Sequence, residues 1–274
     1  AVYWASQLTE VSLMTFTYNA AQDCLNNKNI LITGASDGIG RAVAAEFCAR
    51  DANVIALGRS QEKLEALFDE IEATYPGRLI IHPLDLSAAT SAEYATLASA
   101  LGEQFDTLDG LIHNAALLGS RSPIEYYPDN DWDKLMQVNV TAPFKLTKAL
   151  VPALTRSSDA RVIFTSSSVG RVGRAYWGAY GISKFAIEGL MQTFAEEVGN
   201  ISEISVMSFN PGGTRTAMRR DAYPAEDPIT QPTPESLLPL YLYLMSPAAK
   251  KYHGQALDAR GFEGQRSAAG AKKA

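Results

Sequence analysis

Cysteine is scarce in this sequence, with two residues, Cys24 and Cys48, in a chain of 274. Neither belongs to a CxxC pair or to any spacing typical of metal ligands. We therefore expect no fold built on disulfide bonds or on a structural metal ion. We also expect no metal ion in the functional site.

Long apolar runs and an excess of basic residues are missing as well. No run approaches the ~18 residues that a membrane helix needs, and no basic stretch followed by an apolar core begins the sequence, as in a signal peptide. The formal net charge is -6, whereas nucleic-acid binders usually carry a basic face. We expect a cytoplasmic protein without membrane or nucleic-acid partners.

The composition is that of an ordinary globular protein, with 46% hydrophobic and 20% charged residues. Residues 1–27 show no sustained period, and we expect a partly disordered N-terminal extension there. Its first 13 residues, which precede Met14, are interpreted as an upstream extension. One domain is expected over 28–260, followed by a frayed C-terminal tail over 261–274.

Short apolar runs alternate with amphipathic helical patterns from Lys28 onward. The expected strands are 29–33, 53–57, 79–84, 108–113, 161–165, 204–209 and 255–259. The expected helices are 40–50, 61–73, 91–105, 131–154, 180–198 and 234–245. Parallel strands need helical crossovers, and these cover both faces of a sheet. The pattern predicts a Rossmann-type α/β fold: a doubly wound, mainly parallel sheet of seven strands with helices on both faces, which binds ligands at the carboxyl ends of its strands.

The segment 212–234 interrupts this alternation. It contains two glycines and four prolines and has neither a helical nor a strand period. Connections of this length are commonly lids or binding loops. We therefore expect a substrate lid at about 212–234.

A glycine-rich turn, Thr33-Gly34-Ala35-Ser36-Asp37-Gly38-Ile39-Gly40, follows the first expected strand and opens the first helix. Gly34 permits a tight turn, Gly38 lets the backbone approach a pyrophosphate, and Gly40 allows the helix to pack closely on the strand. The helix N-terminus offers unpaired N–H groups to phosphates. The alternative is an ordinary glycine turn, but the position between a buried strand and a helix favours dinucleotide binding. The expected contacts are Gly34, Ser36, Asp37, Gly38, Ile39 and Gly40.

The end of the second strand, Ala56-Leu57-Gly58-Arg59-Ser60, indicates which dinucleotide binds. An NAD-preferring site places a carboxylate here on the ribose 2′-OH, and no acid is present. Arg59 is available for a 2′-phosphate, which favours NADP (NADPH) over NAD. Two points oppose this interpretation. Arg59 could instead cap a surface loop, and the carboxylate of Asp37 in the glycine-rich turn is an unfavourable neighbour for a phosphate.

Residues after the third and fourth strands face the same edge. Asp85, followed by Leu86, has the chemistry to accept a hydrogen bond from an adenine amino group, or alternatively to cap the next helix. Asn114 and Ala115 place small side chains where the backbone must lie against a flat cofactor. We interpret His113 as a strand-end histidine outside the site.

Tyr180 and Lys184 are four residues apart in a helical pattern, so they lie on one helix face. The ammonium of Lys184 favours the ionised form of a nearby phenol. Moving a phenol pKa from about 10 to about 7 needs about 4 kcal/mol, which requires a dry pocket and a bound cation as well. The alternative is an aromatic side chain on a core face beside a solvated lysine.

As an ordered set, these motifs resemble those of the short-chain dehydrogenase/reductase superfamily in its single-domain form, over about 28–260. The matching marks are the glycine turn, Asp85, Asn114-Ala115, Asn139, Ser167, Tyr180-x-x-x-Lys184 and Pro211-Gly212-x-x-x-Thr216. The runs 165–171 and 210–219 are also similar to the YciK group of bacterial oxidoreductases. One departure is Ala116, which stands in place of the last glycine of the family's Asn-Asn-Ala-Gly pattern and adds a methyl group near the cofactor.

The resemblance implies roles at the reacting centre. Ser167, thirteen residues before Tyr180, would hydrogen-bond the substrate oxygen, and Tyr180 would be the general acid or base. Lys184 would lower the phenol pKa and hold the nicotinamide ribose. Asn139 would position a water in the proton relay; its alternative is a helix kink with a local hydrogen bond.

The resemblance also implies contacts from the lid. Thr214 and Thr216 would contact the nicotinamide carboxamide or the phosphates, with Pro211 and Gly212 shaping the turn. The three arginines of the lid, Arg215, Arg219 and Arg220, are interpreted as solvated charge. Candidate substrate walls are Leu118, Val169, Arg174, Tyr176, Trp177, Met218 and Tyr223.

We expect an NADP(H)-dependent oxidoreductase that interconverts a carbonyl and an alcohol by hydride transfer, with Tyr180 as general acid or base. The superfamily resemblance implies a homodimer or homotetramer that acts on a small molecule. The alternative is a non-catalytic NADP(H)-binding redox sensor. Such a sensor has no need of Ser167, Tyr180 and Lys184 together.

Overall fold

A computed structural model describes residues 16–262 of the chain. The upstream extension expected at residues 1–13 and the tail from residue 263 lie outside the described residues. Within them, Phe16 packs edge-on against Tyr243 and Phe262, with ring centroids 5.4 and 5.1 Å apart. The extent of the N-terminal extension, of the domain and of the tail remains a prediction.

Seven strands form one sheet in the order β3-β2-β1-β4-β5-β6-β7, and every neighbouring pair is parallel. The strands are β1 Asn29–Thr33, β2 Asn53–Gly58, β3 Leu79–Pro83, β4 Gly110–His113, β5 Ala160–Thr165, β6 Ile204–Asn210 and β7 Ala256–Asp258. The prediction of a doubly wound sheet is confirmed, and the described sheet is wholly rather than mainly parallel.

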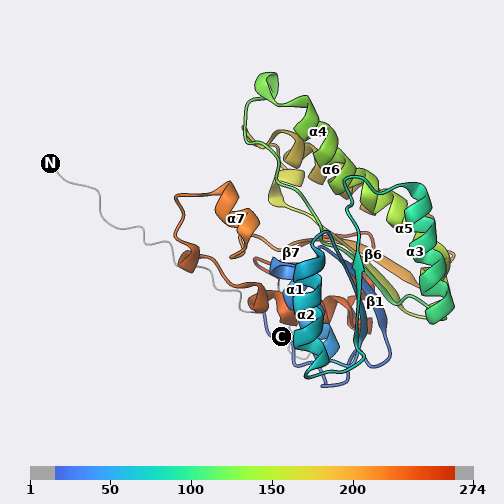
Figure 1. Cartoon of the computed structure of the whole chain (residues 1–274). Coiled ribbons are helices and arrows are strands. Elements are labelled where there is room, and N and C mark those ends of the chain that lie inside the picture. Colours follow the sequence, from blue (N-terminus) through green and yellow to red (C-terminus); the bar gives the residue numbers. More distant parts are fainter. Residues whose placement is uncertain (1–15, 263–274) are drawn as a thin grey trace, which may run out of the picture.

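Helices cover both faces of this sheet (Figure 1). One face carries α1 Gly38–Ala49, α2 Gln61–Glu72 and α8 Leu238–Leu244; the other carries α3 Ser91–Gln104, α5 Ala142–Thr155 and α6 Gly178–Val198. Successive residues of a strand point to opposite faces, so Ile30 and Ile32 of β1 enter the first core and Leu31 enters the second. The central strands β1, β2, β4, β5 and β6 are mostly apolar because both of their faces are buried.

The prediction of one continuous helix over 131–154 is wrong, because the structure interrupts this helix. The structure has α4 Asp129–Met136, a π-helical turn Gln137–Thr141, and then α5. Pro143 has no backbone N–H to donate to the preceding turn, and the buried side chain of Asn139 bonds outside the helix. Single π-helical turns inside α-helices are rare, and they are frequent at functional sites.

The segment expected as a lid contains helix, although its sequence shows no helical period; its role as a lid remains a prediction. It contains α7 Ala217–Ala222 and a 3-10 turn Pro228–Thr230, and a second 3-10 turn Pro234–Leu237 precedes α8. Thr216 caps α7 by accepting a hydrogen bond from the backbone N–H of Arg219 at 3.2 Å. In Figure 1, α7 stands apart from both helical layers.

Two of the three arginines of the expected lid also hold its backbone or side chains, which corrects the interpretation as solvated charge for Arg219 and adds contacts for Arg215, which is exposed. Arg215 donates to the backbone oxygens of residues 228, 229 and 231. Arg219 makes two 2.6 Å bonds to the carboxylate of Glu226, and its guanidinium lies 3.8 Å from the ring centroid of Tyr223. Arg220 is exposed, as expected.

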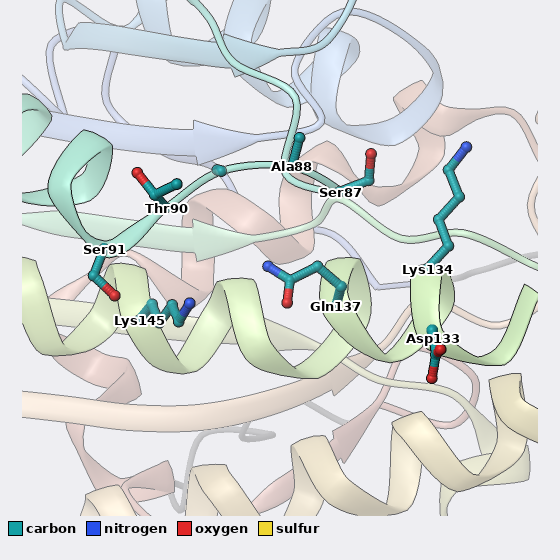
Figure 2. Close-up of a pocket in the computed structure, with 9 residues that line it drawn as sticks. Ser87, Ala88, Thr90, Ser91, Asp133, Lys134, Gln137 and Lys145 are labelled. Carbon is teal, nitrogen blue, oxygen red and sulfur yellow. The ribbon is translucent and has the colours of Figure 1, made fainter. Parts of the chain in front are cut away.

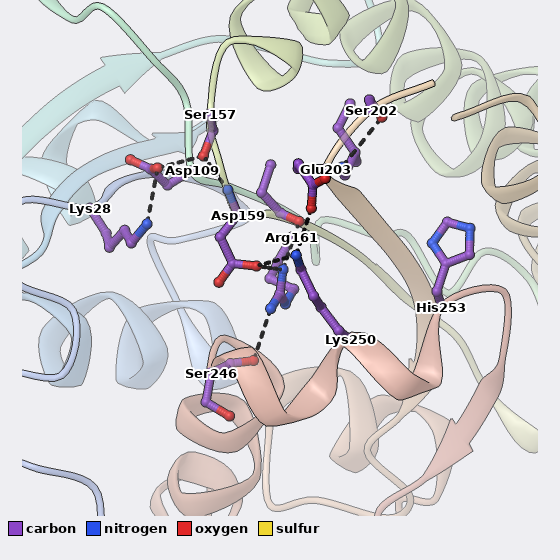
Figure 3. A network of polar contacts seen from close by, with 12 residues as sticks. Lys28, Asp109, Ser157, Asp159, Arg161, Ser202, Glu203, Ser246, Lys250 and His253 are labelled. Atoms are coloured by element: carbon purple, nitrogen blue, oxygen red, sulfur yellow. Dashed lines mark hydrogen bonds and ion pairs between the residues drawn. The ribbon is translucent and has the colours of Figure 1, made fainter. Parts of the chain in front are cut away.

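A network of charges lies at the amino-terminal ends of the strands (Figure 3). Arg161 of β5 is fully buried and donates to Asp159 at 2.7 Å and to the backbone oxygen of Ser246 at 3.0 Å. Asp109, just before β4, accepts from the backbone N–H of Asn29 at 3.0 Å. Since ligands of such sheets bind at the opposite ends of the strands, we assign these charges to the fold. No helix within residues 16–262 is both long and apolar enough to span a bilayer.

Candidate active site

A cavity of about 1170 Å³ opens at the carboxyl ends of the strands. The expected site residues that line it are Gly34, Ser36, Asp37, Gly38, Ile39, Arg59, Asp85, Leu86, Asn114, Ala115, Ser167, Tyr180, Lys184, Pro211, Gly212, Thr214 and Thr216. Gly40 and Asn139 do not line it. A second cavity of about 520 Å³ lies between the segment after β3 and α4–α5, and no expected site residue lines it (Figure 2).

The glycine-rich turn brings three backbone segments into close contact. Gly34 has a φ of +67°, which favours glycine, and a Cβ there would lie 2.9 Å from the Cα of Ala115. A Cβ on Gly40 would lie 2.3 Å from the backbone oxygen of Gly34. Gly40 therefore acts on the packing of α1 against the turn and not on the cavity wall.

Asp37 is the N-cap of α1 and accepts from the backbone N–H of Gly38 at 2.7 Å. Its other carboxylate oxygen forms an ion pair with Lys63 of α2. This hydrogen-bonded ammonium holds the pKa of Asp37 below its usual range. Lys63 lines the cavity with Arg59 and was missed in the sequence. The signal was its position four residues after Arg59, at the first turn of a helix.

Asp85 lines the cavity and caps a turn, not a helix. It accepts from the backbone N–H and the hydroxyl of Ser87, at 2.9 and 2.8 Å, and these bonds lower its pKa. Helix α3 begins later, with Thr90 as its N-cap. Of the two alternatives, helix capping by Asp85 is thus wrong.

Asn114 fastens the end of β4 to the glycine turn. Its side-chain amide donates to the backbone oxygens of Thr33 and Gly34, at 3.2 and 3.3 Å. His113 is buried, and its Nε2 lies 2.8 Å from the hydroxyl of Thr147. Burial lowers the pKa of His113 to about 3, so it remains neutral and belongs to the fold.

Ser167, Tyr180 and Lys184 meet at the end of β5. Burial raises the pKa of the Tyr180 phenol to about 12, and a hydrogen bond with Ser167 opposes this rise. Burial lowers the pKa of Lys184 to about 8, opposed by the charge of Glu188. Lys184 Nζ donates to the backbone oxygen of Thr165 at 2.7 Å and lies 5.6 Å from the ring centroid of Tyr180. The phenol pKa is therefore shifted upward, opposite to the expected direction, because burial outweighs the hydrogen bond with Ser167.

Asn139 lies behind the cavity wall with 2% of its surface exposed. Its Oδ1 accepts from the backbone N–H of Leu117 at 2.8 Å, and its Nδ2 donates to the oxygen of Leu117 at 3.0 Å and to the Ser183 hydroxyl at 3.1 Å. The side chain of Asn139 thus joins the π-helical turn to the loop that follows β4 and to α6. This contact set is neither a local helix bond nor a contact with the cavity.

The segment expected as a lid begins directly after β6. The backbone N–H of Gly212 donates to Asn210 Oδ1 at 3.0 Å, and Gly212 has a φ of +73°. Thr214 is buried, and its hydroxyl has no hydrogen-bond partner within residues 16–262. A buried hydroxyl is normally paired, so Thr214 offers a free donor and acceptor to a molecule in the cavity.

Most of the expected substrate walls line the cavity: Leu118, Val169, Arg174, Trp177, Met218 and Tyr223. Tyr176 does not, because its side chain points to solvent with 58% exposed. Trp177 stands 5.6 Å from Tyr180 and 6.0 Å from Tyr223, measured between ring centroids. Arg121 was missed in the sequence. Its guanidinium carbon lies 4.4 Å from the ring centroid of Trp177. Arg121 also donates to the backbone oxygen of Ala222, which ties the segment expected as a lid to the loop after β4.

These residues fit a dinucleotide. The cavity is lined by glycines at a helix N-terminus, which suits phosphates, by the cations Arg59 and Lys63, and by Thr214, whose hydroxyl is unpaired within residues 16–262. No group of three or more potential metal ligands occurs within the described part of the chain. The fold and this crevice define a class, the dinucleotide-binding oxidoreductases with a Rossmann-type sheet.

The family model for short chain dehydrogenase matches residues 28–227, and the chain belongs to the short-chain dehydrogenase/reductase family. It is thus an NAD(P)-dependent oxidoreductase. The uncharacterized oxidoreductase YciK of Escherichia coli strain K12 is 46% identical over 243 residues, which are 89% of this chain and 96% of that protein. The expected similarity to the YciK group is confirmed.

Solved structures agree with this assignment. A short chain dehydrogenase from Shigella flexneri, complexed with NADP, is 46% identical with a TM-score of 0.85, over 87% of this chain and 99% of that one. A short chain dehydrogenase from Escherichia coli CFT073, complexed with NADPH, has the same identity and TM-score, over 88% and 99%.

Proposed function

We propose that the protein is an NADP(H)-dependent oxidoreductase that interconverts a carbonyl and an alcohol. The observation that carries the proposal is that Ser167, Tyr180 and Lys184 line the same cavity as the glycine-rich turn. Hydride transfer to a carbonyl carbon needs a proton donor at the carbonyl oxygen. Tyr180 lines this cavity, and its phenol is hydrogen-bonded to the hydroxyl of Ser167.

In the proposed reduction, the bound cofactor supplies a hydride to the carbonyl carbon. Tyr180 gives its phenolic proton to the oxygen, so that the products are an alcohol and the oxidised cofactor. Its raised pKa keeps the phenol protonated at neutral pH, and Ser167 orients the oxygen. Lys184 would hold the nicotinamide ribose and return a proton to the phenol. Asn139 does not line the cavity, so its proposed part in the proton relay would act through its contacts with Leu117 and Ser183.

We propose NADP as the preferred cofactor because Arg59 and Lys63 both stand at the rim where a 2′-phosphate would lie. The NADP and NADPH complexes of the two relatives support binding of this cofactor. Titration of NADPH and NADH into the protein tests the preference. Tighter binding of NADH would contradict it.

The proposed substrate is a carbonyl or alcohol of medium size. Trp177, Tyr223 and Met218 supply apolar walls next to Tyr180, and Arg174 supplies a cation at the same cavity. An acidic group on the substrate would find its partner in Arg174. A panel of aldehydes and ketones with and without a carboxylate separates these cases.

The decisive experiment is oxidation of NADPH with this carbonyl panel. Wild-type protein is expected to turn over at least one compound, and Tyr180→Phe is expected to lose at least about 100-fold in kcat while it still binds NADPH. Tight NADPH binding without turnover of any compound would support a redox sensor instead. Equal turnover by Tyr180→Phe would overturn the role of Tyr180.

We further propose a homodimer or homotetramer. Phe144 of α5 and Phe185 of α6 are 51% and 45% exposed, as is expected of residues covered by a second copy. A monomer in light scattering at micromolar concentration would contradict this. The cytoplasmic localisation remains a prediction from the sequence.

A further inference from the structure

Glu188 of α6 is a buried carboxylate for which the proposed reaction has no role. It is 7% exposed and accepts three hydrogen bonds, from the hydroxyl of Ser166, from that of Ser208 at 2.7 Å and from Arg171 Nε at 3.3 Å. An ionised carboxylate only accepts hydrogen bonds. All three contacts are of this kind, and they place a negative charge inside the protein.

This carboxylate continues the row of side chains that forms the site. Tyr180, Lys184 and Glu188 are spaced by four residues, so they lie on one face of α6, one turn apart. Three successive residues at the end of β5 each bond to one of them: Thr165 to Lys184, Ser166 to Glu188 and Ser167 to Tyr180. The end of β5 is therefore fastened to α6 at three successive points, of which Glu188 holds the middle residue of the strand end.

The backbone is packed tightly at this junction. A Cβ on Gly170, in the turn that follows Ser167, would lie 2.6 Å from the Cβ of Lys184. The strand end and the helix cannot slide past each other without breaking these contacts. A change at Glu188 is thus transmitted to both Ser167 and Lys184.

We propose that Glu188 is a positioning residue for hydride transfer: it fixes Ser166, and through it Ser167, and its negative charge favours the ammonium form of Lys184. This inference rests on the proposed function, in which a charged Lys184 holds the cofactor ribose. Within the described residues, no other carboxylate accepts a hydrogen bond from residues 165–167, although Asp258 pairs with Arg171 nearby.

The charges around Lys184 come from three elements. On α6 itself, Tyr180 is a neutral phenol below its raised pKa and Glu188 is the anion. After β5, Arg171 donates to Glu188 and also pairs with Asp258 of β7. Glu188 favours the charged form of Lys184. Arg171 lies against Glu188, and its like charge is expected to disfavour that form, so substitutions of these two residues are expected to act in opposite directions.

The test is the affinity for NADPH, titrated from about pH 7 to about pH 10, the range in which Lys184 loses its proton. Wild-type affinity is expected to fall as Lys184 is neutralised, and Lys184→Met is expected to lack this fall. In Glu188→Gln, the decrease in NADPH affinity is expected at a pH about one unit lower than in wild type. Arg171→Gln is expected to move it upward and keeps the inference testable if Glu188→Gln does not fold.

Ser208→Ala is the matched control, since it removes a hydrogen bond to Glu188 but keeps the charge. It is expected to lower the melting temperature and to leave the pH of the fall unchanged. Curves that coincide for wild type and Glu188→Gln, a shift of the same sign in Arg171→Gln, or a wild-type affinity independent of pH would overturn the role of Glu188. A wild-type protein that does not bind NADPH would overturn the proposed function as well, so the two failures are distinguishable.

Discussion

Lys63 of α2 forms an ion pair with Asp37 of the glycine-rich turn, at the rim of the large cavity and close in sequence to Arg59. The pair gives the unfavourable acid in the turn a partner, which answers the sequence argument against a phosphate there. Both side chains are more than half exposed, 55% and 56%, so the pair contributes little to stability. The pair is instead expected to affect the preference for NADPH over NADH.

Lys63→Gln is expected to lower the affinity for NADPH about fivefold and to leave that for NADH nearly unchanged, because a cation near a 2′-phosphate is lost. Asp37→Asn is expected to raise NADPH affinity about threefold, since asparagine caps a helix as well as aspartate but repels no phosphate. Lys148→Gln, an exposed lysine on α5 outside the cavity, is the control. Equal losses for NADPH and NADH in Lys63→Gln would show that Lys63 does not discriminate between them.

Gly40→Ala is expected to destabilise the protein by about 2 kcal/mol and to weaken NADPH binding at least about tenfold, because its Cβ would overlap the backbone oxygen of Gly34. Gly102→Ala is the matched control. It lies in α3 with nothing within 4 Å of the added Cβ, and there alanine is expected to stabilise by about 0.5–1 kcal/mol. Urea unfolding and NADPH titration measure both effects. Normal binding by Gly40→Ala would mean that the turn tolerates a displaced helix.

Lys184 makes the stability of the cofactor-free protein depend on pH. Its pKa is about 8 in the folded chain and 10.5 when unperturbed, so between these values the unfolded state binds more protons and the free energy of unfolding rises with pH. Below pH 8 the buried charge is a cost. The rise from about pH 7.5 to about pH 10 is expected to be about 2 kcal/mol larger in wild type than in Lys184→Met. Parallel pH curves from urea unfolding would contradict the buried ammonium.

Arg219→Met is expected to loosen the lid, since it removes both bonds to Glu226 and the cation over Tyr223. Limited proteolysis within 212–234 should become several-fold faster, and the KM for a carbonyl substrate should rise more than kcat changes. Arg220→Met, one residue further on, is the control because its nearest acid is 3.9 Å away and both side chains are exposed. Equal proteolysis of the two variants would argue against Arg219 as a lid clamp.

The strands and the glycine-rich turn were predictable because their signals are local. Ile30, Leu31 and Ile32 form an apolar run that is buried on both faces, and Gly34 ends it. The break between α4 and α5 was not predicted, although Pro143 marks it, because proline also fits the first turn of a helix. Helix α7 was missed since its six residues have no apolar period and depend on the cap from Thr216.

The sequence alone determined the order of strands and helices, the glycine turn and the spacing that puts Tyr180 and Lys184 on one helix face. These follow from periodicity and from backbone geometry, which act over a few residues. Only the tertiary structure decided the electrostatics of the site. Burial raised the pKa of the Tyr180 phenol. The packing of the elements brought Lys63 to Asp37 and Glu188 to Ser166. Desolvation and contacts between residues 20 or more positions apart depend on how the elements pack, so no local pattern contains them.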